Sequence, residues 1–136
     1  MSGMPPFIRL DIVTPDRHVL TEEVDEVNIP GSEGYFGVLP GHLPLLTMIG
    51  TGVLSYQLKG KRHPFAVNGG FAEVLPDRVI IMADTLERPE EIDVERAREA
   101  KDRAEKMLAS KEPVDIDQTM AALMRAGVRI AVAEMK

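Results

Sequence analysis

The sequence predicts an all-β domain followed by α-helices: a β-sandwich of about ten antiparallel strands over residues 1–85, then a C-terminal antiparallel helical hairpin over residues 86–136. Two observations predict this division. In the first part, apolar and polar residues alternate and Gly and Pro separate the short runs, which is typical of a sandwich. In the second part, Ala, Glu, Lys and Arg dominate and apolar residues recur with the helical period. The change falls within Asp84–Arg103.

The first strands are predicted from alternation. Phe7–Val13 places an apolar residue at every second position, the pattern of a half-buried strand. Thr14–Asp16 is a turn, because proline fixes φ and the aspartate side chain bonds the following backbone. Two further strands are predicted at Arg17–Thr21 and Glu23–Ile29.

The middle of the chain is rich in turn residues. Gly31–Leu46 contains four glycines and two prolines among apolar residues, which predicts short strands joined by tight corners. Lys59–Lys61, Gly69–Gly70 and Pro76–Asp77 are predicted turns. Between them lie the remaining predicted strands: Thr47–Gly50, Gly52–Leu58, His63–Asn68, Phe71–Leu75 and Arg78–Ala83.

The first predicted helix begins after Asp93 and has an alanine-rich inner face made of Ala97, Ala100, Ala104 and Leu108. Such a face permits close approach but buries little apolar area, at about 25 cal/mol per Å². We therefore expect the hairpin to be held loosely and to be able to detach or open.

The second predicted helix starts close behind the first. Asp115, with Gln118 three residues later, fits a capping box, and Asp117 is a rival cap. Pro113 ends the first helix at Glu112, because a residue before proline leaves the α region. Two helices joined by so short a loop are expected to pack antiparallel.

The start of the first helix has two interpretations. In the structural one, Asp93 is the N-cap, Ile92 and Ala97 form a hydrophobic staple, and Arg96 pairs with Asp93. These four residues then need no ligand. In the functional one, they belong to a binding motif that includes residues further along the chain.

Three more arginines favour the functional interpretation. Arg103 lies on the same helical face as Arg96, and Arg125 and Arg129 share a face of the second helix. In a folded hairpin their guanidinium groups would converge beside a helix N-terminus, an arrangement suited to a polyphosphate. The alternative is a solvated helix surface paired with acids.

Composition excludes several classes of function. The chain of 136 residues carries 22 acidic and 16 basic residues, a net charge of −6, which argues against a general nucleic-acid binder. It has no cysteine, and its three histidines lack metal-ligand spacing. No nucleophile-elbow or P-loop motif is present, so we expect no catalytic and no metal site. No signal peptide or apolar run of about 20 residues is seen, so a membrane link must pass through another protein.

Six motifs occur in order along nearly the whole chain: Val27–Gly34, Gly37–Leu46, Gly69–Val74, Ala83–Thr85, Ile92–Ala97 and Val132–Lys136. Together they resemble the epsilon subunit of bacterial F-type ATP synthases, which is called delta in mitochondria. The block GSEG…PGHLPLL is the most specific part. The short helix motif alone is weak.

The resemblance implies a ten-stranded β-sandwich with a helical hairpin, and a non-catalytic role. Such a subunit belongs to the rotor, where its sandwich binds the gamma subunit and the ring of c subunits and couples proton flow to ATP synthesis. Its hairpin can extend towards the alpha/beta catalytic head and restrain ATP hydrolysis. The expected location is peripheral, on the cytoplasmic face of the bacterial membrane. The alternative is a free-standing nucleotide-sensing module without a rotary partner.

The resemblance also implies site residues. The loop Glu33–His42 matches the part that meets the c ring, with Glu33, Tyr35 and His42 as contact candidates, although His42 has the alternative role of bracing the Pro-Gly corner. No cofactor is required, and ATP is expected as a regulatory ligand. The positions that match ATP-binding residues of relatives are Glu87, Ile92, Asp93, Arg96, Ala97, Arg103, Arg125 and Arg129.

Overall fold

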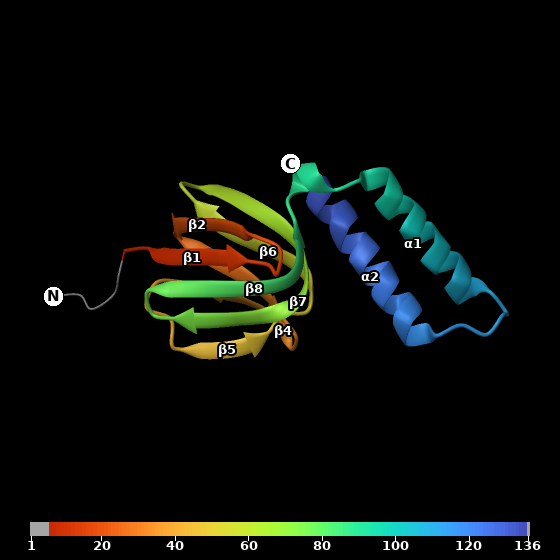
Figure 1. Ribbon diagram of the computed structural model, residues 1–136, viewed down its shortest axis with the longest axis horizontal. Helices are drawn as coiled ribbons and strands as arrows, with labels where there is room; N and C mark the ends of the chain where they lie inside the picture. The colour runs from red at the N-terminus through yellow and green to blue at the C-terminus, as the bar shows by residue number, and fades with distance from the viewer. Residues whose placement is uncertain (1–5, 136) are drawn as a thin grey trace.

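The computed structural model describes residues 6–135, in which eight strands precede two helices (Figure 1). Residues 1–5 of the predicted first domain and Lys136 of the last motif lie outside this range. The elements are β1 (Ile8–Val13), β2 (His18–Val24), β3 (Glu26–Gly31), β4 (Gly34–Val38), β5 (Leu45–Met48), β6 (Thr51–Leu58), β7 (Lys61–Leu75), β8 (Arg78–Glu87), the 3-10 turn η1 (Pro89–Glu91), α1 (Val94–Ala109) and α2 (Ile116–Ala133). The predicted sandwich followed by a helical hairpin is confirmed.

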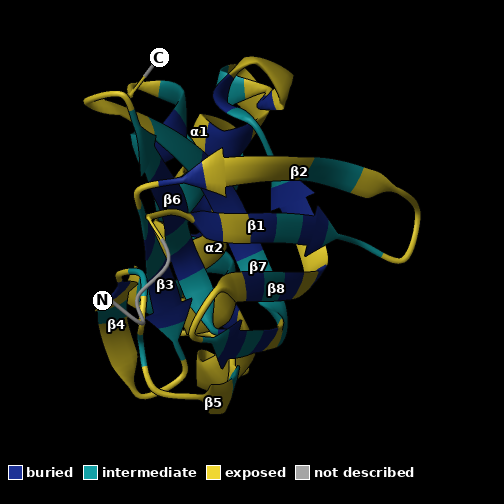
Figure 2. Cartoon of the chain, turned by 90° about the vertical axis from the view of Figure 1, so that its left-hand side faces the viewer, coloured by how far each residue is buried: buried dark blue, intermediate teal, exposed yellow. Residues whose placement is uncertain are grey.

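The strands form one hydrogen-bonded path, β2-β1-β8-β7-β6-β3-β4, with β5 paired to β7. The path folds over so that alternate side chains of its strands meet in a single core, visible in Figure 2 as buried bands along the strands. Eighteen buried apolar residues form this core within residues 6–135, and Phe65 is its largest fully buried side chain. We call this cluster the sandwich core.

One pairing departs from the predicted antiparallel arrangement. β1 and β8 run parallel, with Arg9 opposite Arg78 and Val13 opposite Met82. Local alternation specifies which face of a strand is buried, but it carries no information about the direction of a neighbour from the other end of the domain. The other named strand pairs are antiparallel.

Gly69 and Gly70 do not form the predicted turn. Both have positive φ, 77° and 118°, yet they lie inside the fifteen-residue strand β7. The two glycines bend the strand and do not reverse it, so two predicted strands form one continuous strand. This explains in part why the structure has eight strands and not the predicted ten. Before the bend, β7 pairs with β6; after it, β7 pairs with β5.

The bend also reverses which residues of β7 face inward. Phe65 and Val67 point into the sandwich core before it, whereas Ala72 and Val74 do so after it. Ala66 therefore faces outward before the bend, and Phe71 faces outward after it. One strand thus supplies two different outer surfaces.

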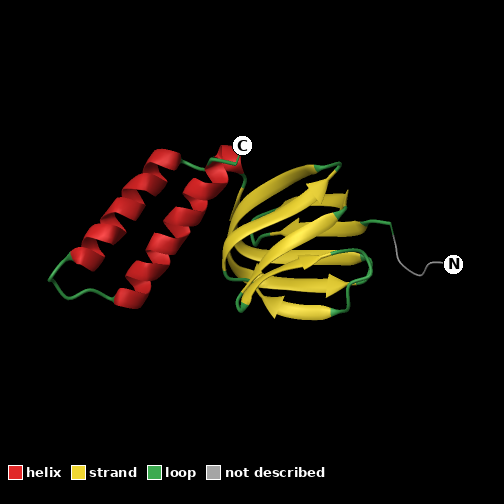
Figure 3. Ribbon diagram, turned by 180° about the vertical axis from the view of Figure 1, so that it is seen from behind, coloured by secondary structure: helices red, strands yellow, loops and turns green. Residues whose placement is uncertain are grey.

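The hairpin covers the first of these surfaces. Helix α2 packs on β6 and β7, and α1 lies beyond α2, away from the sandwich (Figures 1 and 3). Asp93 and Asp115 cap the two helices by accepting hydrogen bonds from the N–H groups of Arg96 and Gln118. The predicted cap Asp115, and not Asp117, therefore begins the second helix.

A small cluster joins the hairpin to the sandwich, and we call it the hairpin seam. It consists of buried Ala66, Ile92 and Val132, with half-buried Val53, Val94, Val128 and Ala133 around them. On the inner face of α1, Ala97 and Ala104 are buried, as the periodicity predicts. The seam removes far less apolar area from water than the sandwich core does.

Candidate functional site

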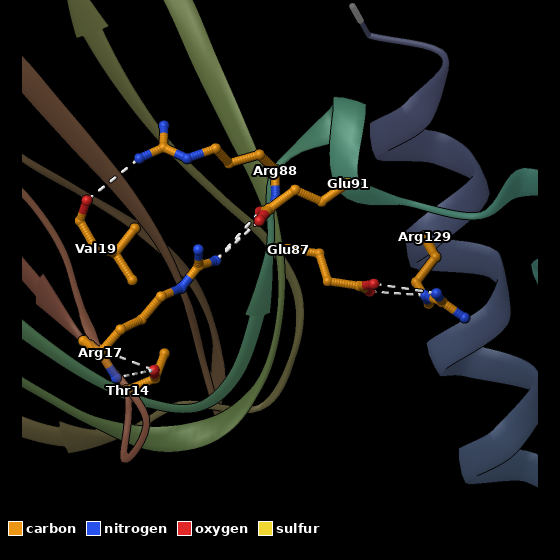
Figure 4. Close-up of polar contacts among 7 residues, drawn as sticks. All are labelled: Thr14, Arg17, Val19, Glu87, Arg88, Glu91 and Arg129. Atoms are coloured by element: carbon orange, nitrogen blue, oxygen red, sulfur yellow. Dashed lines mark hydrogen bonds and ion pairs between the residues drawn. The ribbon is translucent and has the colours of Figure 1, made fainter.

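The link between sandwich and hairpin is fastened by two arginine–carboxylate pairs (Figure 4). Arg129 of α2 donates from Nε and Nη2 to the two carboxylate oxygens of Glu87, at 2.7 and 3.1 Å. Arg17, from the β1–β2 turn, donates from Nη2 to both oxygens of Glu91 at 3.0 and 3.3 Å. Planar guanidinium groups suit such two-point contacts. The first pair holds α2 to the end of β8, and the second holds η1 to the sandwich.

Arg88 completes the second fastening. Its Nη2 donates to the carbonyl of Val19 on β2, and its guanidinium lies over the ring of Phe65, 5.6 Å from the centroid. Its backbone N–H donates to Glu91 at 2.8 Å. We call Arg17, Arg88 and Glu91 the linker clamp.

The linker clamp changes the pKa of the Glu91 carboxyl group. The hydrogen bond from the Arg88 N–H is the largest influence on Glu91 and lowers the pKa of its carboxyl group. The side-chain bond and the charge of Arg17 lower this pKa further, and partial burial opposes them. Elsewhere, burial raises the pKa of the Tyr56 hydroxyl, with a smaller contribution from the charge of Glu22.

The junction residues adopt structural positions. Ile92 is buried in the hairpin seam, Ala97 is fully buried, and Asp93 caps α1 through the N–H of Arg96. Among the described residues, the Arg96 side chain makes no ion pair with Asp93, so that predicted contact is absent. The structural interpretation therefore accounts for Ile92, Asp93 and Ala97, but not for the side chain of Arg96.

The remaining candidates line two grooves. One groove, of about 530 Å³ between the helices, is lined by Arg103 and Arg125 among others. The second, of about 480 Å³ between the hairpin and the end of β8, is lined by Glu87, Arg125 and Arg129. Arg125 borders both grooves, so the structure brings three other candidates close to it: Glu87, Arg103 and Arg129. Ile92, Asp93, Arg96 and Ala97 line neither groove.

The loop candidates fall into two places. Glu33 and Tyr35 lie at the β3–β4 turn, and Tyr35 is 62% exposed although its hydroxyl accepts a 2.8 Å hydrogen bond from the Val53 N–H. Gly52 leaves room for that hydroxyl, since a Cβ there would overlap it. The turn is thus close to the hairpin seam, which contains Val53.

His42 lies at the opposite end of β4. Its Nδ1 is 2.6 Å from the carbonyl oxygen of Leu43, and its backbone N–H donates to Leu39. The neighbouring Gly41 N–H donates to Pro76 in the β7–β8 turn. These contacts match the bracing role for His42, and they separate it from Glu33 and Tyr35.

The sequence reasoning did not identify a surface on the second side of β7. Five apolar side chains share this surface, which we call the outer apolar face: Leu46 and Met48 of β5, Phe71 of β7, and Ile80 and Met82 of β8. Met48, Phe71 and Met82 form one cross-strand row and are each exposed by 41% or more. The sequence did contain a signal for this surface. In these strands the inward positions are apolar, and several outward positions are apolar as well.

Other kinds of site find no support in the part of the chain that is described. Residues 6–135 contain no group of three or more His, Cys, Asp or Glu arranged to hold a metal ion. In the same residues, neither helix combines the length and apolar character needed to cross a bilayer.

Comparisons with known proteins agree over the whole fold. Residues 7–89 match the family model of the ATP synthase delta/epsilon chain β-sandwich domain, and residues 90–134 match that of its long α-helix domain. The chain is 52% identical over 130 residues to the ATP synthase epsilon chain of Nitratidesulfovibrio vulgaris strain DP4, covering 95% of this chain and 97% of that one. The epsilon chain of Solibacter usitatus is 45% identical over 134 residues, covering 98% and 100% of the two chains.

Solved structures agree as well. A chain from the mitochondrial ATP synthase of Euglena gracilis, in a cryo-EM structure of its OSCP/F1/c-ring, superposes with a TM-score of 0.84 at 28% identity. The superposition covers 96% of this chain and 83% of that one. A chain from the central stalk/c-ring of the Tetrahymena thermophila enzyme, at 13% identity and a TM-score of 0.61, shares the fold. The chain therefore belongs to the delta/epsilon family of ATP synthases and is a non-catalytic subunit of that complex.

Proposed function

We propose that this epsilon chain is a rotor subunit that docks on the gamma subunit through the outer apolar face and helps couple proton flow to ATP synthesis. The observation that carries the proposal is the exposed cross-strand row of Met48, Phe71 and Met82, because adjoining exposed apolar side chains mark surfaces that bind a partner. A free-standing nucleotide sensor would have no use for such a face.

The docking proposal is tested by co-purification of the full chain with the gamma subunit. Phe71→Glu places a charge in the centre of the face, and we expect it to weaken binding by two orders of magnitude or more. The matched control is Met124→Glu, which puts the same charge on α2, where Met124 is 58% exposed and lines neither groove of the hairpin. Unchanged gamma binding by Phe71→Glu would contradict docking through this face.

A contact with the c ring is proposed at the β3–β4 turn. Glu33 and Tyr35 are exposed at this turn, with the Tyr35 hydroxyl bonded to Val53, whereas His42 is half-buried and its ring contacts its own loop. We therefore assign the contact to Glu33 and Tyr35 and a supporting role to His42. Through these partners the subunit would lie peripherally at the cytoplasmic face of the bacterial membrane.

The hairpin is proposed to regulate ATP hydrolysis by leaving the sandwich and reaching towards the alpha/beta head. The small hairpin seam supports this, because little apolar area must be exposed for the helices to separate from β6 and β7. ATP is proposed to favour the folded hairpin by binding between the helices, where Arg103 and Arg125 line one groove. Arg129 forms an ion pair with Glu87, so its role in the folded hairpin is to hold α2 against the sandwich.

ATP binding is tested by titration calorimetry of the isolated chain. The double variant Arg103→Ala/Arg125→Ala is expected to lose at least tenfold in affinity, since both cations would face the phosphates. Arg98→Ala is the control, because Arg98 lies on α1 and pairs with Glu95 outside the grooves. Equal affinity of the double variant and the parent would remove the ATP proposal while leaving the docking proposal intact.

A further inference from the structure

One carboxylate interrupts the second cross-strand row of the outer apolar face. Glu73 of β7 lies directly opposite Leu46 on one neighbouring strand and Ile80 on the other. Along its own strand, Phe71 and Leu75 occupy the adjacent positions on the same side, because Ala72 and Val74 point into the sandwich core. Four apolar residues therefore surround one acid.

This acid has no cation within the described chain. Glu73 takes part in none of the ion pairs formed by residues 6–135. The cations on the same side of the sheet are Arg78, which lies opposite Leu75 and diagonal to Glu73, and Arg9, which lies opposite Arg78. Each pairs with another acid, Arg78 with Asp77 at 3.6 Å and Arg9 with Asp11 at 3.4 Å. Glu73 is thus an acid without an ion-pair partner that lies between the exposed apolar row and the charged residues at the edge of the face.

A partner that binds the outer apolar face would cover the Glu73 carboxylate as well as the apolar row. Covering the apolar row removes water from Glu73, and an ionised carboxylate buried without a partner is strongly unfavourable. Charged residues are for this reason depleted from interface centres unless they meet an opposite charge. The acid therefore constrains the chemistry of whatever binds here.

We infer that the partner on the outer apolar face presents an apolar surface with one Arg or Lys side chain placed against Glu73. The inference deepens the proposed function, since it rests on docking of the gamma subunit at this face. An arginine fits best, because its guanidinium offers two parallel N–H donors to a carboxylate. The pair would select the correct register on an otherwise featureless apolar surface.

The same charge disfavours other occupants. A second copy of this chain bound about a two-fold axis at the face would bring one Glu73 towards the other. An anionic membrane surface would also be repelled by a carboxylate in the centre of the contact. A cation-bearing protein partner is the occupant whose charge complements the face.

The test measures binding of the full chain to the purified gamma subunit by surface plasmon resonance. Glu73→Gln keeps the shape and removes the charge, and we expect affinity to fall about 30-fold because the partner's cation is left unpaired. Glu73→Lys opposes two cations, and we expect a fall of about 100-fold or more. Glu105→Lys, at an exposed position on α1, changes the net charge equally and should bind like the parent.

The design separates the inference from the function on which it rests. The inference is supported if both Glu73 variants weaken binding while melting temperature and circular dichroism stay as in the parent. The inference is overturned if Glu73→Gln binds gamma within about threefold of the parent while Phe71→Glu abolishes binding, because the face would then dock without an ion pair. The result for Glu73→Lys does not change this conclusion. If Phe71→Glu also binds normally, docking at this face fails and the inference fails with it.

Discussion

The sandwich core and the hairpin seam hold different parts of this chain, and they differ sharply in size. Within residues 6–135, eighteen buried apolar residues form the core, whereas three buried residues form the centre of the seam. The core contains Phe65 and many Ile, Leu and Val side chains, while the seam relies on Ala66, Ile92 and Val132. The difference teaches that one chain can hold its sandwich by a large apolar core and dock its hairpin through a much smaller apolar contact.

The two fastenings partly compensate for the small seam. The Glu87–Arg129 pair and the linker clamp add directional contacts where apolar area is scarce. Both ion pairs are partly exposed to solvent, so each stabilises the docked hairpin only modestly. Such polar contacts can be broken and remade at little cost, which is compatible with the release of the hairpin that we propose.

The largest expected effect comes from the core. Phe65→Ala should lower the free energy of unfolding of the sandwich by about 3–5 kcal/mol, because it deletes the largest fully buried side chain. Urea denaturation followed by circular dichroism measures the loss. A change below about 1 kcal/mol would show that this ring is not part of a tightly packed core.

The matched change in the seam should be smaller and different in kind. Val132 is fully buried, and Val132→Ala should destabilise the docked hairpin by about 1–2 kcal/mol while leaving sandwich unfolding nearly unchanged. Limited proteolysis of the helices, compared with urea denaturation of the sandwich, separates the two effects. Equal destabilisation of both parts would mean that seam and core unfold as one unit.

Removing the Glu87–Arg129 pair should have an effect of about 1 kcal/mol on hairpin docking, since the two side chains are only 34% and 28% exposed. Arg129→Gln is the test, and proteolytic release of α2 is the readout. Arg98→Gln, which breaks the exposed pair with Glu95, is the control and should leave release unaltered. Identical release by both variants would show that the Glu87–Arg129 pair contributes nothing to docking.

The smallest effect is a pH dependence of the linker clamp. The pKa of Glu91 is lowered from 4.5 in the folded chain, so its contribution to stability is present above that ordinary value and is lost as the pH falls through the lowered one. Because the Glu91 side chain is 34% exposed and its partner Arg17 is 48% exposed, solvent screens the pair and we expect only a few tenths of a kcal/mol. Hairpin release measured between pH 6 and pH 3 should rise less steeply in Glu91→Gln than in the parent. Parallel curves would contradict this role.

Much of the fold was predictable because its signals are local. Alternation identified the strands, and the aspartates Asp93 and Asp115 marked the helix starts, since a cap is made by residues three positions apart. The motifs that carry the family resemblance lie in the same strands and turns. Each of these features can be predicted from a short stretch of the sequence.

The features that were missed depend on distant residues. The parallel pairing of β1 with β8 joins the two ends of the domain. Gly69-Gly70 is compatible with a turn or a bend, and the partners β5 and β6 decide in favour of the bend. The Glu87–Arg129 contact spans 42 positions, and the outer apolar face needs three strands in register. Sequence periodicity holds no information about these pairings.

Native-state hydrogen exchange tests most directly whether the platform and the hairpin have separate stabilities. We predict that amides in the middle of α1 and α2 exchange through an opening that costs clearly less free energy than the global unfolding reported by β1, β7 and β8. The Val132→Ala variant should speed exchange in the helices alone. Protection of the helices equal to that of these strands, rising and falling with them in denaturant, would contradict the account.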